Sequence, residues 1–244
     1  MMPVIGIPLR YGKFKDERAI VYMSERLRRT ILKAGGYVFG IVPVQDVDYI
    51  FTRGNEFDEL HENEKKIIEN NLNNCDGLLF PGGDKFTPYD RFLLEKAIEK
   101  KIPVLGICLG MQLMSCYNGE VYLEKIDSNI NHCQDDDNDL VHKVSISKHS
   151  KLYKILGKEE ISVNSFHNYK ATENDIYNVV ALSEDGLIEA IEYPGDDYFN
   201  IGIQWHPEIS YEFDEDSKKI IDSFIEAARC RNRDKDKSKV LEEV

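Results

Sequence analysis

The residue of this chain that is best placed to do chemistry is Cys108, which lies in the sequence Gly-Ile-Cys-Leu-Gly at positions 106–110. An apolar run at 102–105 predicts a buried strand before it, and the residues from Met111 onward are typical of a helix. A nucleophile between glycines at a strand-to-helix turn is a nucleophile elbow, here with cysteine in place of serine. Only glycine fits beside so sharp a turn, and the helix N-terminus stabilises a thiolate. Because the motif is short, a buried structural cysteine is the alternative.

A base and a carboxylate for this cysteine lie far downstream, in the sequence Gly-Ile-Gln-Trp-His-Pro-Glu at 202–208. The apolar start of this segment predicts a strand that Pro207 stops, which places His206 at the strand end and Glu208 two residues further on. Cysteine catalysis needs a base that takes the thiol proton and a carboxylate that orients the base. Cys108, His206 and Glu208 supply this set in chain order, whereas a lone histidine after a strand is more often structural.

Donors for an oxyanion are expected at a third segment, Leu-Leu-Phe-Pro-Gly-Gly-Asp at 78–84. Its apolar half predicts another buried strand, and its Pro-Gly-Gly turn lets backbone N–H groups approach a ligand closely. Acyl transfer needs such donors where negative charge forms on the carbonyl oxygen. The candidates are the backbone amides of Gly83 and Leu109, the second of which follows the nucleophile. Alone, a Pro-Gly-Gly sequence is an ordinary turn.

Together these segments resemble the class I glutamine amidotransferase superfamily, and they occur in the order that the family uses. The matching segments are 80–84, 103–112 and 202–208, and the resemblance extends from about residue 3 to about residue 228. It implies a Cys-His-Glu triad that cleaves a γ-glutamyl amide through a γ-glutamyl thioester. Carried over to this chain, Cys108 is the nucleophile, His206 the base and Glu208 the residue that orients the base.

Within the superfamily the chain is most similar to the γ-glutamyl hydrolase branch, peptidase C26, which contains γ-glutamyl-γ-aminobutyrate hydrolase. The similar segments are Pro-Gly-Gly-Asp at 81–84 with Pro-Tyr-Asp at 88–90, Val-Asn-Ser-Phe-His-Asn at 163–168, and Val-Ile-Gly-Ile-Pro at 4–8. Two features depart from that branch. Leu109 stands where many of its hydrolases have arginine, and the stretch 115–120 lacks a Gly-Gly turn. Leucine at the elbow is commoner in amidotransferases that donate ammonia, so the resemblance leaves the substrate open.

Contacts to the substrate are expected from the helix after the elbow and from the Asn-Ser-Phe-His-Asn segment. In this superfamily, the glutamine that matches Gln112 binds the α-amino or α-carboxylate end of a glutamyl group. We expect Ser165 and Phe166 to present backbone groups to the same end, although Phe166 fits a position in the core equally well. His167 and Asn168 are expected to face the leaving group.

The remaining polar residues include one further candidate for substrate binding and several without a functional role. Arg10 and Tyr11 follow the first strand, at the edge of the sheet where a substrate carboxylate would bind. The acidic run at 135–139 lacks the glycine and the distal glutamate of a calcium loop, so we expect a solvated loop. His132 and His142 are expected in loops and receive no role. The sequence therefore predicts no metal site and no cofactor.

Composition agrees with a single globular enzyme. The chain of 244 residues is long enough for one α/β domain, and its net charge of −13 argues against nucleic acid as a partner. Its five cysteines, an odd number without metal-ligand spacing, favour free thiols in a reducing compartment. The N-terminal apolar run is too short for a membrane span and lacks the features of a signal peptide. We expect a cytoplasmic location, no membrane partner and a small γ-glutamyl substrate, with a homodimer left open.

Strand and helix patterns alternate along the first half of the chain and predict a parallel sheet with helices on both faces. Strands are expected at 4–9, 37–42, 77–80 and 103–107, and helices at 18–34, 59–72, 91–100 and 217–228. Short strands that predict an antiparallel extension are expected at 121–124, 141–146, 161–164, 179–182 and 187–192. The predicted fold is a flavodoxin-like three-layer α/β sandwich with its active site at the C-terminal ends of the parallel strands. One catalytic domain is expected over 1–228, followed by a frayed, charged tail over 229–244.

The leading hypothesis is a stand-alone hydrolase that releases glutamate from a small γ-glutamyl-amine. A glutaminase that delivers ammonia to a synthase partner uses the same chemistry and is the first alternative. The segment 164–168 also resembles hydrolases that act on a γ-glutamyl group of a nucleotide-linked phosphoramidate. A catalytically silent regulatory module on the same fold is the alternative from another class, and an intact Cys108, His206 and Glu208 argue against it.

Overall fold

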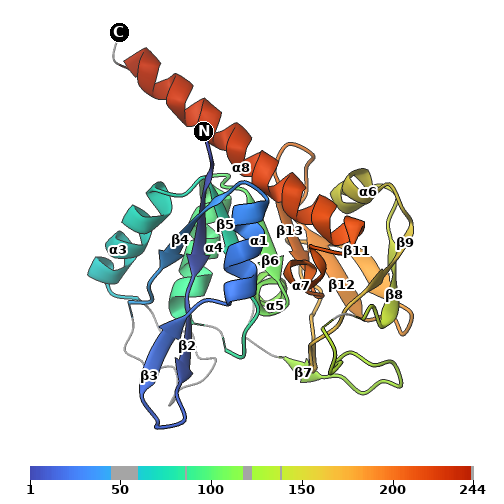
Figure 1. Ribbon diagram of the computed structural model, residues 1–244. Helices are drawn as coiled ribbons and strands as arrows, with labels where there is room; N and C mark the ends of the chain where they lie inside the picture. Colours follow the sequence, from blue (N-terminus) through green and yellow to red (C-terminus); the bar gives the residue numbers. More distant parts are fainter. Residues whose placement is uncertain (45–59, 86, 118–122, 138, 243–244) are drawn as a thin grey trace.

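The computed structural model of the protein describes residues 1–44, 60–85, 87–117, 123–137 and 139–242 (Figure 1). The strands are β1 Val4–Pro8, β2 Arg10–Lys13, β3 Ala19–Tyr22, β4 Tyr37–Ile41, β5 Gly77–Phe80, β6 Val104–Ile107, β7 Glu124–Lys125, β8 His142–Ile146, β9 Glu160–Val163, β10 Tyr169–Lys170, β11 Asn178–Ser183, β12 Ile188–Glu192 and β13 Asn200–Ile203. The helices are α1 Glu25–Lys33, α3 Glu62–Asn73, α4 Pro88–Glu99, α5 Leu109–Ser115, α6 Lys151–Leu156, α7 Pro207–Ser210 and α8 Glu215–Glu242.

A nine-stranded sheet runs through the centre of the molecule in the order β4-β1-β5-β6-β13-β12-β11-β8-β9. The first five strands in this order are parallel, and the last four pair antiparallel. Every residue of β5, β6 and β13 is buried, because helices cover both faces of this part of the sheet. In β8 buried and exposed residues alternate, as is typical of a strand with one face in water. The predicted mostly parallel sheet with an antiparallel extension is therefore confirmed.

Helices on the two faces of the sheet complete three layers (Figure 1). One core lies between the sheet and helices α1 and α8, which contribute Ile31 and Phe224. The second core lies between the sheet and helices α3, α4 and α5, which contribute Leu72, Leu93 and Met111. The helix after the elbow, α5, thus packs on one face, whereas α7, which follows His206, contacts α1 and α8.

The helix expected at 18–34 is wrong in its first half. Strands β2 and β3 form an antiparallel hairpin there, and α1 begins only at Glu25. The hairpin turn includes Glu17, whose φ of 63° lies in the left-handed region. Ile20 and Val21 supply the branched side chains that favour an extended strand, which outweighed the helical spacing of the apolar residues.

Two other helices differ from the sequence expectation because of their caps. Helix α4 begins at Pro88, where Thr87 accepts a hydrogen bond from the amide of Asp90 and the proline occupies the first turn. Helix α6 was not expected, and the hydroxyl of Ser150 caps it. Parts of two expected elements, residue 59 and residues 121–122, lie outside the described residues.

The frayed tail expected after residue 228 is wrong for most of its length. Helix α8 continues to Glu242 without interruption. Residues 229–242 contain neither glycine nor proline and are rich in lysine and arginine, which have good helix propensity. Within the described part of the chain, no helix is long and apolar enough to cross a membrane.

Candidate active site

The backbone at Cys108 has the strained conformation of a nucleophile elbow. Its φ of 50° and ψ of −104° place a non-glycine residue in a sparsely populated region, directly between β6 and α5. Glycine is required on both sides of Cys108, because a Cβ at either position would clash with neighbouring atoms. A Cβ at Gly110 would lie 2.3 Å from the carbonyl oxygen of Phe80, and a Cβ at Gly106 would lie 2.4 Å from the sulfur of Met114. The spacing of the motif therefore reflects how closely α5 packs against the sheet.

The sheet itself brings the base to the nucleophile. Strands β6 and β13 are parallel neighbours with Ile107 opposite Ile203, and the amide of Cys108 donates to the carbonyl of Ile203 at 2.8 Å. His206 follows β13, and its Nδ1 lies 2.7 Å from Oε1 of Glu208. This hydrogen bond fixes the ring so that Nε2 is the atom left to meet the thiol.

The charge state of His206 is set by its two partners. Burial lowers the pKa of an imidazole, but the Glu208 carboxylate and the hydrogen-bonded Cys108 thiol outweigh it and raise the pKa of His206 well above its ordinary value. Only 7% of the surface of Cys108 and 9% of that of Glu208 are exposed, so water screens these interactions weakly. The arrangement favours a protonated imidazole beside the sulfur of Cys108.

The Pro-Gly-Gly turn after β5 closes over this pair. A Cβ at Gly82 would lie 2.8 Å from Cε1 of His206 and 3.6 Å from Cβ of Cys108. A Cβ at Gly83 would lie 3.2 Å from the side chain of Leu109. The structure thus brings together the two residues whose amides are the candidate oxyanion donors, Gly83 and Leu109, beside the nucleophile.

Arg10 supports the glycine turn, because its guanidinium binds protein groups rather than a substrate carboxylate. Its Nη1 donates to both carboxylate oxygens of Asp90 at 2.9 Å, and its Nη2 donates to the carbonyl of Pro81 at 2.9 Å. The side chains of Arg10 and Asp90 are both buried. The candidate role of Arg10 in binding a substrate carboxylate is not supported, because its carboxylate partner is Asp90 of the protein itself. No local signal links Arg10 to Asp90, because they lie on different elements far apart in sequence.

Asn164 is a positioning residue that sequence reasoning included only as part of a motif. Its Nδ2 donates to the carbonyl of His206 at 2.8 Å, and its Oδ1 accepts from the amide of His206 at 2.8 Å. The ring of Phe166 packs edge-on against the imidazole of His206, with centroids 5.7 Å apart. The segment after β9 therefore holds both the backbone and the ring of the base.

Gln112 is buried on α5, one turn after the nucleophile, and its side-chain nitrogen already has protein partners. It donates to the carbonyl of Tyr169 at 3.0 Å and to Oε1 of Gln204 at 3.3 Å. Ser165 is fully buried, and its backbone amide donates to Oε1 of Gln134 at 2.6 Å. The contacts of Gln112, Ser165 and Phe166 with a glutamyl group remain predictions.

His167 does not lie where the sequence suggested. Its Nδ1 is 3.1 Å from the carbonyl of Tyr169, and its Nε2 is 3.7 Å from Oε1 of Glu189, so both ring nitrogens face protein groups rather than a leaving group. His132 and His142, expected in loops, are each only 4% exposed and pack beside it. His142 is the first residue of β8, and its place in the alternating pattern of that strand is the signal that could have indicated burial.

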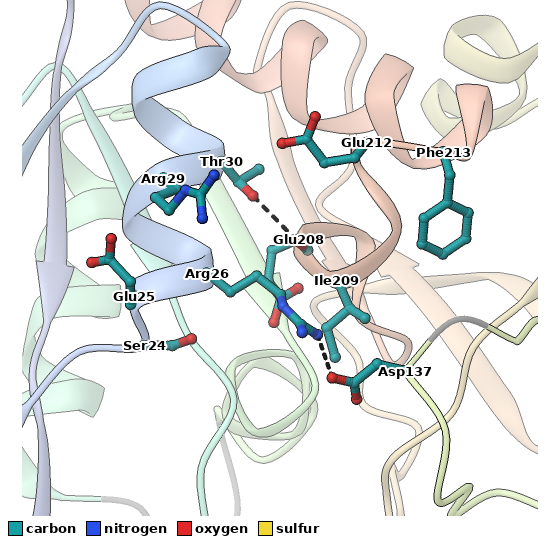
Figure 2. A pocket seen from close by; sticks show the side chains of 10 residues that line it. All are labelled: Ser24, Glu25, Arg26, Arg29, Thr30, Asp137, Glu208, Ile209, Glu212 and Phe213. Atoms are coloured by element: carbon teal, nitrogen blue, oxygen red, sulfur yellow. Dashed lines mark hydrogen bonds and ion pairs between the residues drawn. The ribbon is translucent and has the colours of Figure 1, made fainter.

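Two cavities open beside the carboxylate of Glu208. One of about 360 Å³ is lined by Gly83, His206 and Glu208, together with residues of the β3–α1 segment. The other, of about 640 Å³, lies between α1 and α7 and is lined by Arg26 and Arg29 (Figure 2). In Figure 2 the guanidinium of Arg26 reaches across to Asp137, with which it forms an ion pair of 2.7 Å.

The fold and the site together define an α/β protein with a nucleophile elbow, in which a cysteine, a histidine and a glutamate converge beside a glycine turn. The family model Peptidase C26 matches residues 88–208. A candidate glutamine amidotransferase of Schizosaccharomyces pombe is 32% identical over 184 residues, covering 64% of this chain and 71% of that protein. The chain belongs to the class I glutamine amidotransferase-like superfamily.

Two further comparisons bear on substrate and fold. The γ-glutamyl-CDP-amidate hydrolase of Campylobacter jejuni is 31% identical over 122 residues, which covers 49% of this chain and 50% of that protein. The crystal structure of a candidate GMP synthase component from Thermoplasma acidophilum matches with a TM-score of 0.64 at 17% identity, over 97% of this chain and 98% of that one. The second similarity shows the shared fold.

Proposed function

We propose that this protein is a cysteine-dependent hydrolase that cleaves the γ-glutamyl amide bond of a small γ-glutamyl-amine and releases glutamate. The observation that carries the proposal is the convergence of Cys108, His206 and Glu208, with Nδ1 of the imidazole held at 2.7 Å by the carboxylate. The raised pKa of His206 supports a ready thiolate–imidazolium pair. A silent regulatory module would have no need of the strained backbone at Cys108.

The proposed reaction has two halves. The thiolate of Cys108 attacks the γ-carbonyl, and the amides of Gly83 and Leu109 bind the oxygen as it becomes negative. His206 protonates the departing amine, which leaves a γ-glutamyl thioester on the sulfur. The neutral imidazole then takes a proton from water, the hydroxide attacks the thioester, and glutamate departs with the thiolate restored.

The glutamyl end is expected to bind near α5. Because the side-chain nitrogen of Gln112 already donates to two protein oxygens, its carbonyl oxygen is the atom left for a substrate. A carbonyl oxygen accepts hydrogen bonds, so it suits the α-ammonium group rather than the α-carboxylate. The backbone amide and carbonyl of Ser165 are already bonded to Gln134, so of this segment Phe166 is the candidate for a backbone contact at this end of the proposed site.

The experiment that tests the proposal is product analysis with the purified chain alone. A panel of γ-glutamyl-amines should be offered beside free glutamine, and glutamate release should be measured for each. We expect at least one γ-glutamyl-amine to be hydrolysed with a higher kcat/KM than glutamine. Activity that appears only after a synthase is added would favour the ammonia-donating alternative, and no labelling of Cys108 by a γ-glutamyl electrophile would favour a silent module.

A second candidate substrate is a γ-glutamyl nucleotide phosphoramidate. The second cavity offers it Arg26 and Arg29, and guanidinium groups bind phosphates well, although Arg26 pairs with Asp137 and the lining also includes Glu25, Glu208 and Glu212. The similarity to the Campylobacter jejuni enzyme points the same way. If a phosphate-bearing leaving group binds there, replacing both arginines by alanine should raise KM for the phosphoramidate and leave KM for an uncharged γ-glutamyl-amine unchanged.

A further inference from the structure

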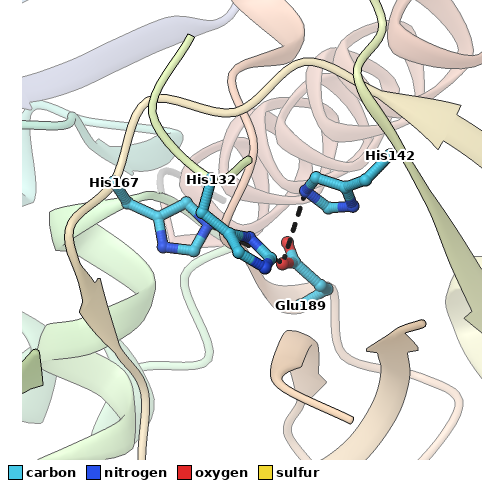
Figure 3. A group of neighbouring side chains, drawn as sticks. All are labelled: His132, His142, His167 and Glu189. Atoms are coloured by element: carbon cyan, nitrogen blue, oxygen red, sulfur yellow. Dashed lines mark ion pairs between the residues drawn. The ribbon is translucent and has the colours of Figure 1, made fainter. Parts of the chain in front are cut away.

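The structure contains a buried cluster of three histidines and one glutamate, none of which belongs to the proposed triad (Figure 3). This His-Glu cluster consists of His132, His142, His167 and Glu189. Its members come from four segments, namely the loop before β8, the start of β8, the turn before β10, and β12. Their exposed fractions are 5% or less, and one ligand atom from each lies within 4.8 Å of all the others.

Each imidazole of the cluster has an outer nitrogen that meets a protein oxygen. The three contacts are His132 Nε2 with Asp185 Oδ2 at 3.1 Å, His142 Nδ1 with the carbonyl of Lys143 at 3.4 Å, and His167 Nδ1 with the carbonyl of Tyr169 at 3.1 Å. An oxygen at this position takes the ring N–H, which fixes the tautomer and leaves a lone pair on the inner nitrogen. This outer contact to a carboxylate or a carbonyl is the usual environment of a metal-binding histidine.

The inner atoms of the cluster point at one another without hydrogen bonds. Among the described residues, Nδ1 of His132, Nε2 of His142 and of His167, and both carboxylate oxygens of Glu189 have no hydrogen-bond partner although they are buried. The three nitrogens lie 3.5, 3.7 and 3.7 Å from Oε1 of Glu189. Buried polar atoms without partners are costly, so a group of five in one place calls for an occupant.

These separations suit a shared ion better than direct pairing. A charge-assisted hydrogen bond between an imidazolium and a carboxylate is about 2.7–2.9 Å long, well short of the 3.5–3.7 Å found here. Ligand atoms at zinc distances around a tetrahedral centre lie about 3.3–3.5 Å from one another. One protonated ring could pair with Glu189, but the other two nitrogens would still lack partners. The widest separation in the cluster, within 4.8 Å, requires the rings to draw in slightly around the ion.

We propose that the His-Glu cluster binds one Zn²⁺ ion as a closed, structural four-ligand site. Three imidazole nitrogens and one carboxylate oxygen form a donor set that suits zinc and related transition-metal ions. The charges also balance, because Glu189 and the outer Asp185 together neutralise the two positive charges of the ion. With four protein ligands that are each at most 5% exposed among the described residues, the site leaves no position for a reacting water.

The proposed ion joins segments that also hold the catalytic base. His167 directly follows Phe166, whose ring packs on His206, and Asn164 of the same segment bonds the backbone of His206. Strand β12, which carries Glu189, bonds to Gln204, two residues before the base. A metal at the cluster would therefore stiffen the segment that positions His206, at a distance from the chemistry itself.

Metal analysis of the parent protein is the first test. The chain is produced without a polyhistidine tag in zinc-supplemented medium and analysed by inductively coupled plasma mass spectrometry. We expect about one zinc per chain, removal by a strong chelator with a fall in Tm, and recovery after one equivalent of Zn²⁺. Substitution by Co²⁺ should give the visible absorption of a tetrahedral ion without a thiolate charge-transfer band. A metal-free protein that binds neither ion stoichiometrically overturns the proposal.

Variants then locate the ion. His142→Ala and Glu189→Gln should each reduce bound zinc at least tenfold, and Asp185→Asn should weaken zinc affinity by about 10–100-fold. The matched control is His149→Ala, which removes an exposed histidine near the same strand and should keep the metal. Zinc retained by both ligand variants overturns the assignment to this cluster. If the ligand variants do not fold, the cobalt spectrum of the parent protein decides, because nitrogen and oxygen ligands exclude a cysteine site.

Discussion

At the scale of single residues, Cys108 carries the bond-making step of the proposed mechanism. We expect Cys108→Ala to abolish turnover and to leave the fold intact, because alanine lacks the thiol but fills the same buried place. Turnover and Tm should be measured together, with Cys116→Ala as the control on the same helix, which should keep its activity. Hydrolysis retained by the Cys108→Ala protein would overturn the assignment of the nucleophile.

In the proposed mechanism, Glu208 acts through the imidazole of His206 rather than on the substrate. We expect Glu208→Gln to lower kcat by about 10²–10⁴-fold with a smaller change in KM, because the thiol and the oxyanion donors remain. Its carboxylate also helps to raise the pKa of His206, so without it that pKa falls. The imidazolium is then lost at a lower pH, and the alkaline limb of the kcat/KM profile should move to lower pH.

The control for this change is Glu212→Gln, which alters an exposed glutamate of the same region that pairs with Lys33. It should leave both kcat and the pH profile as in the parent protein. A Glu208→Gln variant with parental kinetics would reduce the triad to a dyad of Cys108 and His206.

At the scale of elements, the close approach of α5 to β5 makes Gly110 indispensable. Gly110→Ala would drive a Cβ to 2.3 Å from the backbone oxygen of Phe80, which cannot turn aside as a side chain could. We expect a loss of about 1–3 kcal/mol in the free energy of unfolding, together with reduced kcat from a displaced Cys108. Urea unfolding and steady-state kinetics measure the two effects.

Gly40→Ala is the matched control, because its added Cβ would meet only the flexible end of Leu9, at 3.2 Å. It should change the free energy of unfolding less than Gly110→Ala and should not change kcat. Equal effects of the two substitutions would show that the elbow tolerates a wider gap between α5 and β5.

The elements and the triad could be predicted from sequence to the extent that their signals are local. A few residues of sequence are enough to predict each of three elements, namely the strand before Cys108, the glycine turn and the strand before His206. The hairpin of β2 and β3 was missed because its apolar residues also fit a helical period. Three other features could not be predicted, because each joins segments that only the folded sheet brings together. They are the Arg10–Asp90 pair, the hydrogen bonds between Asn164 and His206, and the His-Glu cluster.

At the scale of the whole molecule, we expect activity to depend on an intact central sheet. Trp205 is the single tryptophan of the chain, is 1% exposed and directly precedes His206. We expect tryptophan emission and activity to change in the same urea transition, because the end of β13 positions both the fluorophore and the base. Far-UV circular dichroism should follow the same curve. Activity lost at lower urea than the emission change would show that the site opens before the sheet does.

The pairing of β6 with β13 has a consequence for the life of the newly made chain. The nucleophile emerges from the ribosome well before β13, which begins at Asn200 of a 244-residue protein. Domains fold as units, and pairing between distant strands is slow, so β6 cannot complete its pairing until β13 has also been made. Until then Cys108 lacks the strand that brings His206 to it, and the proposed triad is incomplete.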